Sequence, residues 1–157
     1  MQAMTIEDVL KATGGTLLSG DIHQTFNDVI SDSRKVTAGV LFVPLVGEKF
    51  DGHEFIKAAF DLGASAVLTQ RSTDDLIDKT IVKVEDTLKA FGDIAKYYKL
   101  KYNVPTVSVT GSVGKTTTKD MLASVLSQKY NTLKTMGNFN NEIGLPLTIL
   151  RIRREHE

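Results

Sequence analysis

The sequence predicts an α/β protein in which short buried strands alternate with amphipathic helices. Short apolar and β-branched runs recur along the chain and are typical of buried strands. Between them lie longer segments whose apolar residues repeat at helical spacing. In the second part of the chain, the order strand, loop, helix, strand favours largely parallel strand pairing.

The first part of the chain is expected to alternate helices with strands. A helix is predicted in TIEDVLKATGG (5–15), because a threonine can cap it, acidic residues fill its first turn and glycines end it. GHEFIKAAFDLG (52–63) and DTLKAFGDIAKYYKLKY (86–102) repeat apolar residues on one helical face. The expected strands are VLFVPLVG (40–47), in which Pro44 leaves the hydrogen-bond ladder on one side, ASAVLTQ (64–70) and TIVKV (80–84).

A domain boundary is predicted near Asn103, which separates residues 1–102 from 103–157. Pro105 is expected to end the preceding helix and to hold Asn103 and Val104 in extended geometry. After the boundary we expect a strand from Thr106, a glycine loop, a helix, a further strand, and a last helix beginning near Glu142.

Composition excludes several classes of function. Lys and Arg number 19 against 19 Asp and Glu, so the chain has no overall basic field for binding nucleic acid. The chain has no cysteine, and its N-terminus lacks the basic and apolar segments of a secretion signal. No apolar run approaches the roughly 20 residues that a membrane-spanning helix needs. A cytoplasmic protein without membrane insertion is therefore expected.

The stretch TGSVGKTT (110–117) is the most informative for chemistry. A loop between a strand and a helix can direct backbone N–H groups at one point, where the helix dipole also favours an anion. Gly111 and Gly114 permit close approach of a phosphate, Lys115 supplies a positive charge, and the Thr116 hydroxyl can bind Mg²⁺. The usual motif would place its first glycine at position 109, where this chain has valine. An incidental turn between a strand and a helix is the alternative to a nucleotide phosphate site.

Three asparagines, at 138, 140 and 141, lie just before the last predicted helix. Their amides can satisfy a turn, cap the helix or contact a polar ligand. Lys119 and Asp120, which follow the glycine loop, are interpreted as a solvated helix face. His53 in GEKFDGH is interpreted as structural in preference to catalytic.

Long motifs in this sequence resemble the Mur ligase family. TGSVGKTTTKDML is followed by GNFNNEIGLPLTIL, and both are preceded by SDSRKVTAGVLFVPLVGEKFDGHEFIKAAFDLGASAVLTQ. These segments occur in the family's order and cover nearly the whole chain. The NFNNEIGLPLT element looks most like the member of the family that adds D-alanyl-D-alanine.

The resemblance implies a fold, a reaction and a set of site residues. A small α/β domain that binds the UDP precursor would be followed by the start of an ATPase domain with parallel strands. The implied reaction joins D-alanyl-D-alanine to UDP-N-acetylmuramoyl-tripeptide through an acyl phosphate, with ATP and Mg²⁺, in a monomeric enzyme. Lys115 would stabilise the transferred phosphoryl group as the catalytic residue, and Thr116 would bind the metal. The implied ATP-binding residues are Thr110, Gly111, Ser112, Val113, Gly114, Lys115, Thr116 and Thr117, and the implied substrate-binding residues are Ser33, Arg34, Lys49, Phe50, Asn138 and Asn141.

Several alternatives stay open on the sequence alone. Arg34 can fork onto a diphosphate or form a surface ion pair with Asp32. By comparison with the family, the chain reads as an N-terminal fragment that does not ligate by itself. The ligase that adds the third peptide residue, a folate-extending ligase, a stand-alone nucleotide-binding module and a non-catalytic interaction domain are the other readings of its function.

Overall fold

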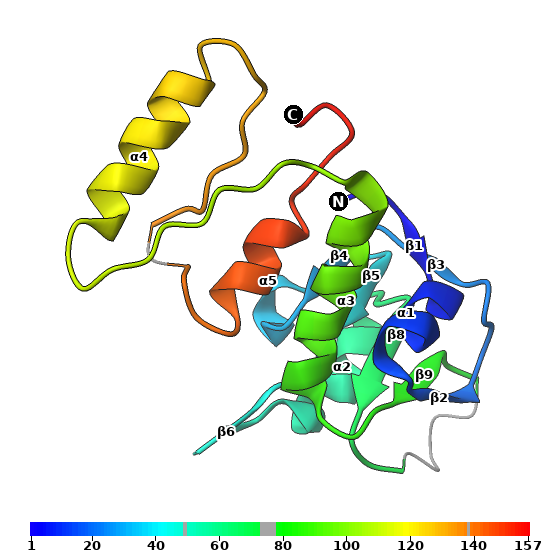
Figure 1. The fold of residues 1–157 in the computed structure, drawn as a ribbon. Coiled ribbons are helices and arrows are strands. Elements are labelled where there is room, and N and C mark those ends of the chain that lie inside the picture. The colour runs from blue at the N-terminus through cyan, green and yellow to red at the C-terminus, as the bar shows by residue number, and fades with distance from the viewer. Residues whose placement is uncertain (49, 73–77, 138) are drawn as a thin grey trace.

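The computed structural model describes residues 1–157 except 49, 73–77 and 138 (Figure 1). It confirms the α/β class, with one main sheet and helices on both of its faces. The helices are α1 (Ile6–Thr13), α2 (Ile56–Asp61), α3 (Thr87–Tyr102), α4 (Lys115–Leu126) and α5 (Gly144–Ile149), with short 3-10 turns η1 (Ser33–Lys35) and η2 (Gly52–Phe55).

The main sheet has the strand order β2-β9-β8-β5-β4 in the described part of the chain. The neighbours β4 and β5, β5 and β8, and β8 and β9 are parallel, whereas β2 pairs antiparallel with β9 at the edge. Two short antiparallel pairs, β1 with β3 and β6 with β7, lie outside this sheet. The strands are β1 (Met4–Thr5), β2 (Thr16–Ser19), β3 (Thr25–Phe26), β4 (Asp28–Ile30), β5 (Val40–Phe42), β6 (Val46–Gly47), β7 (Phe50–Asp51), β8 (Ala66–Thr69) and β9 (Ile81–Lys83).

Alternation along the strands separates two apolar cores. Leu41 of β5 and Leu68 of β8 face a core that includes buried residues of α1 and α3. Their neighbours Phe42 and Val67 face a second core with α2. Each parallel strand is therefore covered on both sides, which is why these strands read as continuous apolar runs in the sequence.

The ends of α1 and α3 show how local sequence sets element boundaries. Thr5 and Asp8 form a capping box at the start of α1, and Gly14 ends that helix in a left-handed conformation. Asn103 ends α3 in the same conformation, with φ 44°. The expectation that Asn103 is extended was wrong, because Pro105 restricts only Val104, while asparagine tolerates the left-handed cap.

The second part of the chain differs from the expected strand pattern. The segments 104–110 and 131–136 run without helical or strand assignment, and the described residues supply no ladder partner for them. Among the described residues, the expected parallel pairing is therefore found before Asn103 and not after it. Figure 1 shows these two segments leading to and from α4, which stands away from the sheet, while α5 lies beside α3. No helix in the described ranges is both long and apolar enough to cross a membrane.

The segment 16–30 contains strands that the sequence analysis did not predict. TLLS forms β2, TF forms β3 and DVI forms β4. Each run is short and partly polar, so none carries the apolar signal of β5 or β8.

Candidate ligand-binding site

The carboxyl ends of the parallel strands collect the polar residues expected to bind substrate. Ser33 and Arg34 follow β4, and Phe50 follows β5 in the β6–β7 hairpin. Because β4 and β5 are parallel neighbours, these segments leave the same edge of the sheet. In open α/β sheets this is the edge at which ligands bind.

Arg34 binds a carboxylate of its own segment. Its Nε and Nη2 donate to the two carboxylate oxygens of Asp32, each at 2.9 Å. The Arg34 side chain is 85% exposed, so its guanidinium group lies at the surface. The hydrogen bond from Arg34 lowers the pKa of the Asp32 carboxyl to about 2. The structure thus shows the ion pair that was the alternative reading of Arg34, and its role toward a diphosphate stays a prediction.

Phe50 presents an aromatic ring to solvent. It is 54% exposed and stacks on Phe55, with ring centroids 5.5 Å apart. An exposed ring supported from behind is suited to stacking with a planar ligand. Lys49 lies outside the described residues, so its predicted contact with substrate is not placed.

A polar network under the hairpin holds His53. Its Nδ1 lies 2.7 Å from Asp51 Oδ1, and its Nε2 accepts from the Gln70 backbone N–H at 3.1 Å. Since a backbone N–H can only donate, the ring proton lies on Nδ1. The backbone N–H of His53 and then its ring lower the pKa of the Asp51 carboxyl. His53 is buried and bonded at both ring nitrogens, as a structural histidine would be.

Arg71 joins this network and was missed by the sequence analysis. Its guanidinium donates to the second carboxylate oxygen of Asp51. Its place in the sequence could have indicated it, because Gln70 and Arg71 directly follow the buried strand β8, at the edge of the sheet where ligands bind.

The glycine loop has the backbone geometry of an anion site. Gly111 has φ 151° and Gly114 has φ 80°, values that favour glycine. Gly114 is the N-cap of α4 and places no side chain on the first N–H groups of the helix. These groups are therefore available to a phosphate. The Lys115 ammonium group bends over the loop and donates to the Gly111 carbonyl.

The predicted ATP-binding residues all lie in this loop or in the first turn of α4. Thr116 and Thr117 are exposed there, and the Thr116 hydroxyl is a hard oxygen donor of the kind that Mg²⁺ prefers. Among the described residues, no three His, Cys, Asp or Glu side chains come together as a metal-binding group. The magnesium role of Thr116 stays a prediction.

In residues 139–143 before α5, here called the asparagine turn, one side chain bonds to the first residue of the helix. The Asn141 side-chain oxygen accepts from the Gly144 N–H at 2.7 Å. Its predicted contact with substrate therefore has to use the amide nitrogen or follow a rearrangement. Asn140 lies on the wall of a groove that Lys115 and Thr116 also line. Asn138 is outside the described residues.

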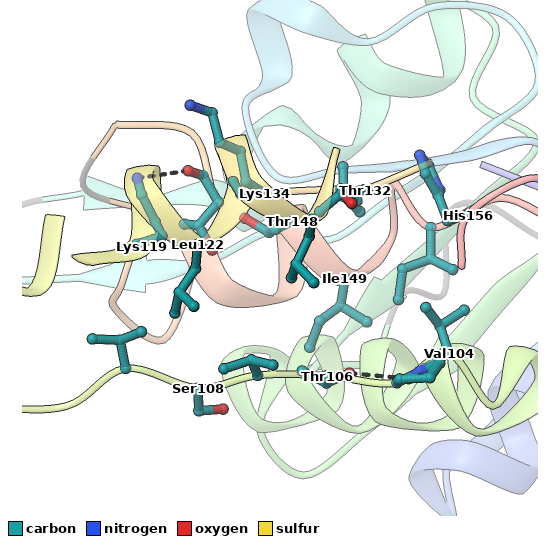
Figure 2. A pocket seen from close by; sticks show the side chains of 18 of the residues that line it. Val104, Thr106, Ser108, Lys119, Leu122, Thr132, Lys134, Thr148, Ile149 and His156 are labelled. Carbon is teal, nitrogen blue, oxygen red and sulfur yellow. Dashed lines mark hydrogen bonds between the residues drawn. The ribbon is translucent and has the colours of Figure 1, made fainter. Parts of the chain in front are cut away.

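This groove has a volume of about 720 Å³ and lies between α4, α5 and the segments 104–109 and 130–135. Figure 2 shows Val104, Leu122 and Ile149 among its apolar walls, with Lys119 at the α4 side. The first turn of α4 after the glycine loop and the asparagine turn thus border one cavity.

Two family models match the chain. One is described as the Mur ligase family, catalytic domain, and matches residues 25–99. The other is described as the Mur ligase middle domain and matches residues 109–157. The chain belongs to the Mur ligase family.

Curated and solved Mur ligases resemble the chain over most of its length. The UDP-N-acetylmuramoyl-tripeptide--D-alanyl-D-alanine ligase of Bacillus subtilis is 43% identical over 155 residues, which cover 98% of this chain and 34% of the relative. A crystal structure of MurF from Acinetobacter baumannii has a TM-score of 0.92 and 34% identity, over 99% of this chain and 34% of that one. MurF ligase from Thermotoga maritima in complex with ADP has a TM-score of 0.76 and 37% identity, over 83% of this chain and 30% of that one. The chain therefore spans about a third of the length of the Mur ligases that it matches.

Proposed function

We propose that this chain is part of an ATP-dependent amide ligase that adds D-alanyl-D-alanine to UDP-N-acetylmuramoyl-tripeptide. The observation that carries the proposal is the glycine loop at the start of α4, in a backbone that follows MurF with a TM-score of 0.92. The Bacillus subtilis relative is named for this reaction. That name favours D-alanyl-D-alanine over the amine used by the ligase for the third residue.

The reaction is an activation followed by an acyl transfer. An oxygen of the precursor carboxylate attacks the γ-phosphorus of ATP, ADP leaves, and an acyl phosphate remains. The amine of D-alanyl-D-alanine then attacks the acyl carbon, phosphate leaves, and the nitrogen loses a proton. Lys115 stabilises charge on the transferred phosphoryl group. Mg²⁺, when bound at the Thr116 hydroxyl, supplies further neutralisation of the β- and γ-phosphate oxygens.

The two halves of the chain divide these tasks in our proposal. Residues 1–102 bind the UDP precursor, with Ser33, Arg34 and Phe50 at the carboxyl edge of the sheet. Residues 103–157 begin the ATP-binding domain, and the left-handed Asn103 at the end of α3 supports a boundary there. The proposed setting is the cytoplasm, and the proposed assembly state is a monomer.

Calorimetric titration of this chain with UDP-N-acetylmuramoyl-tripeptide, UDP and MgATP tests the proposal. Saturable binding of both UDP ligands is expected. Arg34→Ala should weaken it about ten- to hundredfold, since a hydrogen bond to a charged group is worth roughly 1.5–3 kcal/mol. Lys35→Ala is the matched control, because Lys35 is the adjacent exposed cation and lies 3.9 Å from the same Asp32. Failure to bind any UDP ligand would contradict the precursor assignment.

A separate titration tests the assignment of the glycine loop as the ATP site. MgATP binding should be lost in Lys115→Met and kept in Lys129→Met, which removes another lysine from the same half of the chain. MgATP binding that survives in Lys115→Met would place the nucleotide outside the glycine loop.

A further inference from the structure

Lys119 of α4 reaches across to the segment that leads into the asparagine turn. Its ammonium group donates to the Thr135 carbonyl at 2.9 Å and to the Gly137 carbonyl at 3.3 Å. The side chain is only 22% exposed, so the earlier interpretation of a solvated position was wrong for Lys119. Figure 2 shows it reaching from α4, with a dashed line marking a hydrogen bond. Because Lys115 is one helical turn earlier, Lys119 lies on the same side of α4 as the phosphate-binding loop.

A backbone hydrogen bond links Met136 with Phe139 beside these carbonyls. The Phe139 N–H donates to the Met136 carbonyl at 3.1 Å, between the two carbonyls that Lys119 binds. At the other end, Asn141 caps the Gly144 N–H. A side-chain carbon at Gly144 would lie 2.5 Å from Phe139 Cα, so the turn packs directly on the start of α5. Lys119 fixes one end of this turn and α5 fixes the other.

Lys134, a second lysine, forms a contact in the opposite direction, from this segment to α4. Lys134 lies 2.9 Å from Asp120, whose side chain is 45% exposed, as expected for a solvated helix face. Both of these side chains are about half exposed, and exposed ion pairs contribute little to stability. Lys119 also lies 3.7 Å from Asp120, but it is less exposed and donates to two backbone carbonyls. The two lysines therefore form a natural comparison.

We propose that Lys119 is a positioning residue, which holds the asparagine turn in place relative to the phosphate-binding loop. The inference rests on the proposed function, in which the loop binds ATP, and on the substrate contact that the family resemblance implies for Asn141 of the turn. In that arrangement Lys119 sets the approach of the peptide carboxylate to the γ-phosphate without touching either group. The UDP end, at the other half of the chain, does not depend on it.

Hydrogen exchange of the ligand-free chain tests the positioning directly. The variants are Lys119→Met, which keeps the length of the side chain but has no donor, Lys119→Arg, which keeps donors, and Lys134→Met as the control. In Lys119→Met the amides of Phe139, Gly144 and Leu145 should exchange about tenfold faster, while those of Phe91 and Ile94 in α3 stay unchanged. Lys119→Arg and Lys134→Met should stay close to the wild type. Unchanged exchange in Lys119→Met, or equal acceleration in α3 and the turn, would overturn the inference.

Binding separates this inference from the proposed function. Lys119→Met should weaken UDP-N-acetylmuramoyl-tripeptide about tenfold and leave UDP unaltered, and Lys119→Arg should restore the tripeptide affinity. Equal weakening of both ligands, or of neither, contradicts the positioning role. If the wild-type chain binds neither ligand, the proposed function fails, and the exchange measurement still decides what Lys119 holds.

Discussion

At the scale of single residues, Arg34 already binds a carboxylate of the protein in the absence of ligand. Two hydrogen bonds join its guanidinium to Asp32, the N-cap of η1. Asp32 also accepts the Arg34 backbone N–H and so caps the same short turn. A diphosphate that binds Arg34 must compete with this carboxylate or share the fork with it.

The pKa of Asp32 provides the test at this scale. The carboxyl should titrate with a pKa of about 2 in the wild-type chain. In Arg34→Ala its pKa should rise toward the ordinary value of 3.8, whereas Lys35→Ala should change it little. Because the folded pKa is depressed, the ion pair is complete above about pH 4 and is lost as the pH falls through 2. Carbon-13 NMR of the Asp32 carboxyl measures both titrations, and an unshifted pKa in Arg34→Ala would refute the pairing.

At the scale of elements, glycine decides where two segments can meet. Gly144 begins α5 against the backbone of Phe139 and leaves no room for a side chain. Gly92 lies inside α3, where an added methyl group would meet no atom within 4 Å. The same substitution is thus expected to have opposite effects at these two positions.

Gly144→Ala should destabilise the chain by about 1–3 kcal/mol, because the new methyl group must displace the turn. Gly92→Ala should stabilise it by about 0.5–1 kcal/mol, because alanine loses less backbone entropy in a helix interior. Urea denaturation of both variants measures these differences in the free energy of unfolding. A Gly144→Ala variant as stable as the wild type would mean that the turn is not packed on α5 as described.

The elements also show which structure can be predicted from sequence. α1, α3 and the apolar strands β5 and β8 were predictable, because capping residues and apolar periodicity are local signals. β2, β3 and β4 were not, since their runs are short and partly polar and carry no such local signal. The segments from Thr106 have strand-like composition but no ladder among the described residues. Strand formation needs a neighbour as well as a propensity.

The candidate site also has a part that could be predicted from sequence and a part that could not. The glycine loop was predictable because its spacing alone defines the geometry at the start of α4. The roles of Arg71 and Lys119 were not, because each binds a group on another element. A contact of that kind leaves no local pattern in the sequence.

At the scale of the whole molecule, Tyr98 connects three distant parts of the chain. Its hydroxyl donates to the Ile152 carbonyl at 2.6 Å and accepts from the Gln2 N–H at 2.9 Å. The ring is fully buried in the core beside α1. Burial raises the pKa of this phenol to about 12, so the stability of the whole chain is linked to alkaline pH.

The free energy of unfolding should therefore fall as the pH rises from about 10 to about 12. In that window the unfolded chain loses the Tyr98 proton while the folded chain keeps it. Tyr98→Phe should flatten this slope and cost about 1–3 kcal/mol at neutral pH, because the buried Ile152 carbonyl loses its donor. Tyr130→Phe, at an exposed ring, is the control. Urea denaturation across this pH range measures both effects, and an equal slope in Tyr98→Phe would contradict the assignment.

The sheet order has a consequence for the time course of folding. β4, β5, β8 and β9 are neighbours in the same order as in the sequence, so each strand can add to the one before it. β2 precedes all of them but pairs with β9, which brings Thr16 to Lys83. Closing so long a loop costs more chain entropy than any other pairing in this sheet and slows its formation. β2, the strand of this sheet that is synthesised first, is therefore expected to be the last to join it.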